Sequence, residues 1–423
     1  MISVFRDRMV KHTLRNQSPA LFETLQDQGG PRYFEKETVH FCGLLGAATG
    51  ELAVFLPRNC GDDDLKTARM TVQALARYGR ETESRSGHET GNDETVSVLP
   101  VIHDLARDFT DYGIYAERQR YKSRDSGKPD WKSTIASEVP LLRQNGVAVY
   151  PVMRTTRVVD SRDVPLARIQ AAVLREIDER HGWWLDAGFS GAAKSLDTVE
   201  PPRLPRALWG HALRDALNGL YAARPMALAS LLIRYLDENR SVSGGAFIAG
   251  VADFERVWEV MLRQILPHEE TRRWNARLPK PAYVDQDHNI QKIGSGMEMD
   301  IVLREPKEDR DHLHILDAKY YAATGKNSVP KTGDIVKQLM YETAMKAAIE
   351  NAGSRETVSG GFVFPSGGAH AQPFVKAGLT SGQTLDYRFP TIHIHYVDIG
   401  DVMNAYVARQ TFRLDLQRNP SPA

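Results

Sequence analysis

Residues 297–320 read MEMDIVLREPKEDRDHLHILDAKY, and this stretch decides the fold of the C-terminal part of the chain. Two largely apolar runs flank the polar segment EPKEDRD, a pattern that predicts two strands joined by a hairpin turn. Asp300 lies on the first predicted strand and Asp317 on the second, seventeen residues later. The hairpin is therefore expected to bring two carboxylates close together.

A lysine accompanies the second of these acids. Side chains alternate along a strand, so Asp317 and Lys319 point to the same face. A bare D-x-K occurs about once by chance in a chain of this length, and its weight here comes from the second acid on the neighbouring strand. Metal-assisted phosphodiester cleavage needs carboxylates that hold Mg²⁺ and a cation that positions water and offsets phosphate charge. The three side chains form a candidate nuclease site; the alternative is an exposed ion pair on an edge strand.

Helices on both sides of the hairpin add further candidates. Residues 253–266 form an amphipathic pattern that places Glu255 and Glu259 one turn apart, and one of the two is expected to reach the metal cluster. Residues 333–353 predict a second helix, with Gln338 and Tyr341 one turn apart. This pair would orient substrate or support the lysine-bearing strand; the simpler interpretation is a helix cap and a core aromatic.

The chain is expected to divide near the Gly- and Ser-rich run RSVSGGAFIAG. Residues 1–240 would form an N-terminal α+β region, with a further break near 194–208, where three prolines occur. Residues 241–423 read as helix, strand, strand, helix, strand, strand, helix. This order predicts an α/β fold.

Composition excludes several classes of protein. The 54 basic and 54 acidic residues give a net charge of zero, so contact with DNA would depend on local basic patches. Two cysteines, Cys42 and Cys60, are too few for an iron–sulfur cluster or a four-cysteine zinc site. No apolar run approaches the length of a membrane helix and no signal peptide is evident, so the cytoplasm is the expected location, away from any membrane.

Four elements together resemble the PD-(D/E)xK nuclease core: the acid-bearing helix, M-E-M-D-I-V-L, I-L-D-A-K-Y-Y and the helix with Q-L-M-Y. This resemblance implies a mixed central sheet flanked by helices. The sequence departs from that pattern at Met299, where many members have proline. H-F-C-G-L-L-G at 40–46 and K-P-D-W-K-S-T-I at 128–135 extend the likeness over most of the chain. With these motifs the sequence resembles LlaJI-type restriction endonucleases, which are similar to McrC, the nuclease subunit of modification-dependent restriction systems.

This resemblance implies a Mg²⁺-dependent endodeoxyribonuclease subunit of a restriction system in phage defence. Asp300, Asp317 and Glu259, which we favour over Glu255, would bind the metal, and Lys319 would position water and stabilise the transition state. The implied partners are double-stranded DNA and a separate McrB-like AAA+ GTPase ring, which itself binds GTP. The region up to about residue 240 would dock onto that ring, and a homodimer would allow double-strand cleavage.

A basic segment at 116–135 is the candidate surface for DNA or for the GTPase. Its cations would contact phosphates, or one of them would reach a nucleotide site on the ring; a solvated loop is the third interpretation. The residues concerned are Arg118, Arg120, Lys122, Lys128, Trp131 and Lys132.

Three other functions stay open at this point. A stand-alone restriction endonuclease would cut plasmid with Mg²⁺ and no GTPase. A RecB- or Cas4-like exonuclease is less favoured because the cysteines of its usual cluster are missing. A non-catalytic activator of a GTPase ring would stimulate GTP hydrolysis without cutting DNA.

Overall fold

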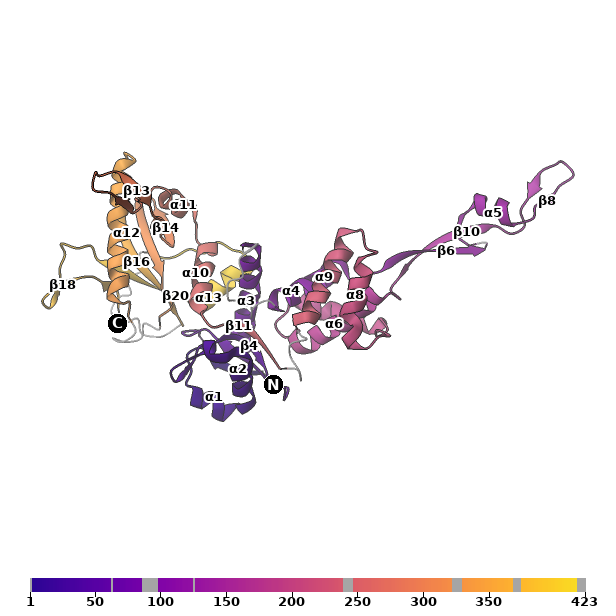
Figure 1. The fold of residues 1–423 in the computed structure, drawn as a ribbon, viewed down its shortest axis with the longest axis horizontal. Coiled ribbons are helices and arrows are strands. Elements are labelled where there is room, and N and C mark those ends of the chain that lie inside the picture. Colours follow the sequence, from indigo (N-terminus) through magenta and orange to yellow (C-terminus); the bar gives the residue numbers. More distant parts are fainter. Residues whose placement is uncertain are drawn as a thin grey trace. The chain divides into compact units, whose positions relative to one another are not determined.

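A computed structural model describes residues 2–61, 64–85, 98–124, 126–238, 246–321, 329–367 and 374–416 of the chain. The chain forms two compact units (Figure 1). The first combines Met1–Pro100 with Val242–Ala423, and the second is Val101–Ser241. Within the described ranges, no helix combines the length and the apolar character that crossing a bilayer requires.

The N-terminal sheet of the first unit joins distant parts of the sequence. Its strand order is β1 (Ile2–Arg6), β5 (Leu52–Leu56), β4 (Cys42–Gly46) and β11 (Phe247–Val251). β1 is parallel to β5, whereas β4 pairs antiparallel with both β5 and β11. Strand β11 lies beyond the predicted boundary at 240/241, yet its partner β4 lies in the first 50 residues. The predicted division is therefore corrected: residues 1–100 group with the C-terminal segment.

A pair of glycines permits this strand pairing. Gly43 and Gly250 lie opposite each other in the ladder between β4 and β11. A Cβ atom at Gly43 would lie 2.4 Å from the Cα of Gly250, and Gly43 has a φ of +151°. A side chain at this point would separate the strands. Around the sheet lie α1 (Lys11–Gln17), α2 (Pro19–Gly29), a 3₁₀ turn at Gly30–Tyr33, β2 (Phe34–Glu35) and β3 (Thr38–Val39).

The second sheet of this unit carries the predicted site. Its strand order is β14 (Ile301–Glu305), β15 (His312–Ala318), β16 (Thr357–Ser366), β20 (Ile392–Asp398) and β17 (Lys376–Ala377). β14 and β15 form the predicted hairpin, and β15, β16 and β20 run parallel. The predicted α/β fold with a mixed sheet and flanking helices is confirmed (Figure 1).

Helices pack against this sheet and against each other. α12 (Thr332–Asn351) connects β15 to β16, and its Tyr341 and Met345 share an apolar core with Leu313 and Ile315 of β15. α10 (Phe254–Ile265), the predicted amphipathic helix, buries Trp258 and contacts β15. α13 (Ile399–Ala408) packs on α10 and on α3 (Leu65–Arg85). The remaining elements are α11 (Glu269–Asn275), β12 (Ala282–Val284), β13 (Ile290–Ile293), β18 (Thr380–Ser381) and β19 (Thr384–Leu385).

The second unit is a group of helices with a strand ribbon. Its helices are α4 (Val98–Tyr112), α6 (Pro165–His181), α7 (Ala187–Ala193), α8 (Trp209–Leu217) and α9 (Ala223–Glu238). In its ribbon, β10 (Arg154–Ser161) is the central strand and pairs with β6 (Glu117–Arg124) and with β7 (Lys128–Pro129). Between β7 and β10 along the chain lie α5 (Trp131–Ser137), β8 (Leu141–Leu142) and β9 (Ala148–Val149). In Figure 1 the ribbon extends away from the helices of the same unit.

The predicted break near 194–208 does not divide this unit. That segment forms 3₁₀ turns at Lys194–Thr198 and Arg206–Leu208. Arg168 of α6 donates a hydrogen bond to the Pro201 carbonyl at 2.9 Å, so the proline-rich segment is held against the helix. Pro225 lies in the first turn of α9, where a missing N–H costs nothing.

Candidate active site

Asp317 and Asp300 meet across the predicted hairpin. In the ladder between β14 and β15, Ile301 lies opposite Leu316. Extending this register by one residue places Asp300 opposite Asp317. The Lys319 N–H donates to the Val363 carbonyl at 3.0 Å, so the backbone beyond Asp317 stays aligned with β16. The hairpin therefore positions both acids at one end of the sheet, as the sequence predicts.

Asp317 is almost fully buried and is neutralised by two lysines. Its side chain is 3% exposed; Lys319 Nζ lies 2.8 Å from Oδ2, and Lys337 Nζ lies 3.1 Å from Oδ1. Burial raises the pKa of the Asp317 carboxyl, and the nearby Asp300 adds to the rise, while the two lysines oppose it. A second positive charge close to this carboxyl is thus favourable.

Lys319 is held on both sides by acids. Its Nζ lies 2.8 Å from Asp317 and 2.9 Å from Oδ1 of Asp334, and its side chain is 12% exposed. Burial alone would lower the pKa of the Lys319 ammonium, but the two carboxylates outweigh burial and raise it. This lysine is therefore a fixed cation at neutral pH.

The predicted glutamate faces the same acids from α10. Burial, followed by the charge of Asp300, raises the pKa of Glu259 to about 7. Arg263, one turn further along the helix, lies 2.6 Å from Asp300 Oδ1 and 3.8 Å from Glu259. Burial and Asp253 raise the pKa of Glu255, whose other neighbours include Lys319. Glu259 lies on the Asp300 side of the site, which fits its choice over Glu255.

Gln338 and Tyr341 both contact backbone carbonyls. Gln338 is 1% exposed and its side-chain amide donates to the carbonyls of Ile315 (2.6 Å) and Gly361 (3.3 Å). The Tyr341 hydroxyl donates to the Glu298 carbonyl at 2.5 Å. Gln338 thus ties β15 to β16, and Tyr341 fixes the segment that leads to Asp300. Their position supports the strands, one of the two roles expected from the sequence.

Three polar residues of the cluster were missed from the sequence: Arg263, Asp334 and Lys337. All three lie on the two helices that carry the predicted candidates. A signal for Lys337 exists, because it lies four residues before Tyr341 and so on the same helix face. For Arg263 and Asp334 the sequence gives only helical spacing from Glu259 and Lys337.

The chemistry of the donor set fits a hard divalent cation. Carboxylate oxygens are the ligands that Mg²⁺ prefers. Burial, followed by the charge of Asp300, raises the pKa of Glu259, so a cation bound beside it would favour its ionised form. Within the described ranges, no group of three or more His, Cys, Asp or Glu side chains is already arranged around one point. The carboxylates are instead paired with Arg263 and the lysines.

The N-terminal sheet contacts the chain directly after Lys319. The Asn59 amide donates to the carbonyls of Tyr321 and Pro365, each at 3.1 Å. The Tyr320 hydroxyl accepts from the Arg58 N–H at 2.7 Å and lies 3.4 Å from Asp7 Oδ2. Burial raises the pKa of the Asp7 carboxyl to about 6. The loop after β5 therefore holds the ends of β15 and β16.

The predicted basic segment lies on the ribbon of the second unit. Arg118, Arg120 and Lys122 alternate along β6, so all three share one face, and all are exposed. Trp131 begins α5 and is 53% exposed, while Lys128 and Lys132 are also exposed. The segment is thus a solvent-facing surface with a large aromatic, as a binding role requires; the side chain of Trp131 is not in a core.

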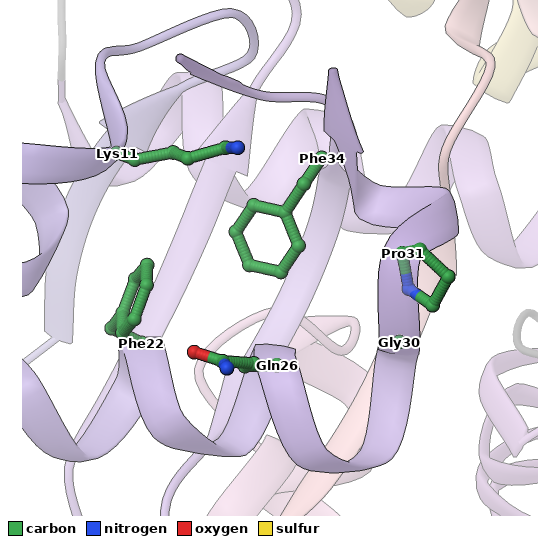
Figure 2. A pocket seen from close by; sticks show the side chains of 6 residues that line it. All are labelled: Lys11, Phe22, Gln26, Gly30, Pro31 and Phe34. Atoms are coloured by element: carbon green, nitrogen blue, oxygen red, sulfur yellow. The ribbon is translucent and has the colours of Figure 1, made fainter. Parts of the chain in front are cut away.

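A cavity of about 390 Å³ lies in the N-terminal part of the first unit (Figure 2). The rings of Phe22 and Phe34 border it, 5.7 Å apart and tilted by 57°. Lys11 lies over the Phe34 ring and donates to the Lys36 carbonyl. The cavity is formed by α1, α2 and the following turn, elements that carry none of the predicted site residues.

Comparisons with known proteins agree with the predicted family. The LlaJI restriction endonuclease family model matches residues 49–406. The Type II restriction enzyme BsuMI component YdjA of Bacillus subtilis (strain 168) is 26% identical over 317 residues, which cover 73% of this chain and 63% of that protein. The chain thus spans less than two thirds of the length of this relative.

Two solved structures match this chain at low similarity. A half-complex from the tetradecameric assembly of Thermococcus gammatolerans McrB AAA+ hexamers with bound McrC has a chain that is 11% identical, with a TM-score of 0.42, covering 97% of this chain and 98% of that chain. A chain of the Thermococcus gammatolerans McrBC complex is 10% identical, with a TM-score of 0.31, covering 63% of this chain and 89% of that chain.

Proposed function

The chain belongs to the LlaJI restriction endonuclease family, and from this membership we propose that it is a metal-dependent endodeoxyribonuclease with a PD-(D/E)xK core. The observation that carries the proposal is the meeting of Asp300, Asp317 and Lys319 at one end of a hairpin in a mixed sheet. The reaction is phosphodiester hydrolysis: water adds to phosphorus and a sugar oxygen leaves.

Asp300 and Asp317 would hold Mg²⁺, with Glu259 as the third carboxylate. The ion, when bound, stabilises charge on the phosphate and lowers the pKa of water. Lys319 would fix the orientation of Asp317 and contribute a permanent positive charge beside it. Arg263 would release Asp300, with which it pairs at 2.6 Å, when that carboxylate binds metal.

The proposed substrate is double-stranded DNA, and the proposed partner is an McrB-like AAA+ GTPase that binds GTP. Support for both comes from the family and from the sequence motifs that resemble McrC. The exposed cations and Trp131 of the ribbon suit contact with DNA phosphates or with a protein ring. A homodimer for double-strand cleavage stays a prediction.

The test is cleavage of supercoiled plasmid by the purified chain with Mg²⁺, with and without an McrB-type GTPase and GTP. We expect cutting to depend on Mg²⁺ and to be abolished by Asp317→Ala. Glu342→Gln is the matched control, because Glu342 is also a buried acid paired with a lysine, Lys346, at 2.7 Å on α12.

Each outcome separates the candidate functions. Cutting that requires the GTPase supports the McrC-like subunit, and cutting with Mg²⁺ alone supports a stand-alone restriction endonuclease. Stimulated GTP hydrolysis without any scission would favour a non-catalytic activator. Retained cutting by Asp317→Ala would overturn the assignment of the active site.

A further inference from the structure

Lys337 is a partly exposed cation of the candidate active site, as is Arg263, which pairs with Asp300 instead of Asp317. Lys337 lies on α12, its Nζ is 3.1 Å from Asp317 Oδ1, and its side chain is 46% exposed. The same Nζ lies 5.3 Å from the centre of the Tyr341 ring. Its long side chain thus reaches a buried catalytic carboxylate while its outer surface stays in water.

Lys319 contacts the same carboxylate but differs from Lys337 in its burial and in its second partner. It is 12% exposed and its Nζ is shared between Asp317 and Asp334. Moving this ammonium toward a substrate would break two ion pairs and leave buried acids unpaired, which is costly. Lys319 therefore cannot easily reach a phosphate that approaches from solvent.

Lys337 can leave Asp317 at much lower cost. When it leaves, Asp317 keeps Lys319 at Oδ2, so the buried carboxylate is never without a cation. Its departure also frees Oδ1, the oxygen that Lys319 does not occupy. Because Lys337 is 46% exposed, water can solvate its ammonium during this movement, and Lys319 still offsets the charge of the buried carboxylate.

Resting on the proposed function, we propose that Lys337 is a second catalytic lysine, whose ammonium moves from Asp317 Oδ1 to a non-bridging oxygen of the scissile phosphate. Lysine ammonium groups bind phosphates as point charges. A phosphate that approaches three carboxylates is repelled by them, and a mobile cation at the solvent side offsets this repulsion. Lys319 then acts as a positioning residue that holds Asp317.

The first test measures DNA binding without divalent metal, as a function of salt. Each lysine–phosphate contact contributes about 0.9 to the slope of log K against log[salt]. We expect Lys337→Ala to reduce the slope by about this amount and Lys337→Arg to retain it.

A matched control is present on the same helix. Lys346 is 52% exposed and pairs with the buried carboxylate of Glu342, just as Lys337 pairs with Asp317. Lys346→Ala also removes one positive charge from the surface of α12, but it removes no proposed phosphate contact. Any change in slope that it causes therefore reflects the loss of surface charge alone. Equal slopes for Lys337→Ala, Lys346→Ala and the unaltered chain would overturn the proposal.

The second test is single-turnover plasmid cleavage with Mg²⁺. We expect Lys337→Ala to lower the rate by on the order of 10²-fold, the usual effect of removing one group that stabilises transition-state charge, with partial recovery in Lys337→Arg. The thermal midpoint should stay near that of the unaltered chain, since Asp317 keeps Lys319. Full activity of Lys337→Ala beside an inactive Asp317→Ala would refute the role of Lys337 and leave the nuclease assignment intact; absence of cleavage by every form would instead remove the proposed function.

Discussion

Replacing Glu259 with glutamine should stabilise the protein while it weakens cleavage. Burial and the nearby Asp300 raise the pKa of Glu259 to about 7, from an ordinary value of 4.5. Above pH 7 the folded chain must therefore keep an unfavourable negative charge in this cluster. Glutamine has nearly the same shape and carries no charge at any pH.

The size and sign of this effect follow from the two pKa values. The raised pKa means that the folded state favours the protonated form, so the contribution of Glu259 to stability is complete below about pH 4.5 and is lost as the pH rises to about 7. The full difference corresponds to at most about 3.4 kcal/mol. The side chain is 32% exposed, so solvent screening reduces this to roughly 1–2 kcal/mol.

The assay is thermal or urea unfolding in EDTA across pH 4–8. Glu259→Gln should match the unaltered chain near pH 4 and exceed its stability by about 1–2 kcal/mol at pH 8, with less cleavage in Mg²⁺ because one carboxylate is lost. Glu269→Gln, at an exposed glutamate that begins α11, is the control and should change neither property. A Glu259→Gln variant that is less stable than the unaltered chain at pH 8 would refute the reasoning.

Two further predictions concern the hydrogen bonds from Asn59 to the ends of β15 and β16, and the strand ribbon of the second unit. Asn59→Ala removes these two hydrogen bonds and places alanine at a φ of +55°, so the free energy of unfolding, measured by urea titration, should fall by about 2–3 kcal/mol and cleavage should decrease. Asn59→Gly removes the same hydrogen bonds but tolerates the backbone angle, so its free energy of unfolding should fall by only about 1–2 kcal/mol. The double variant Arg120→Ala/Lys122→Ala should leave the thermal midpoint unchanged, because both side chains are exposed. It should weaken either DNA binding or stimulation of the GTPase. If neither property changes, the ribbon is a solvated surface and has no binding role.

The part of the fold that the sequence predicts is the part built from local contacts. The hairpin that carries Asp300 and Asp317 has a short turn between alternating strands, and α10 and α12 have strong helical spacing. Pairing between β4 and β11 joins residues about 200 positions apart, and no local sequence pattern predicts which distant strand will pair with β4. The predicted boundary at 240/241 therefore located a real junction but assigned residues 1–100 to the wrong side of it.

The candidate site shows the same limit at the level of single side chains. The grouping of Asp300, Asp317 and Lys319 follows from strand alternation and hairpin pairing, because these backbone positions alone decide that the three side chains face each other. The partners of these groups do not: Arg263, Asp334 and Lys337 reach the cluster through long or rotatable side chains from helices. Helical spacing places them on a face, but which charge each one contacts depends on how the helix packs against the sheet.

The hydrogen bonds from Arg58 and Asn59 to the chain after Lys319 explain why an N-terminal sheet belongs to the same compact unit as the candidate active site. Asn59 holds the ends of β15 and β16, the two strands that Gln338 also joins a few residues earlier. Lys319 thus lies between two side chains that each hydrogen-bond to both chain segments, namely Gln338 of α12 and Asn59 of the loop after β5. Because the ion pairs of Asp317 need sub-ångström alignment to offset the cost of burying charge, both sets of hydrogen bonds serve the same end. The loop after β5 is therefore a structural support of the candidate active site, although none of its residues carries a group that we assign to the chemistry.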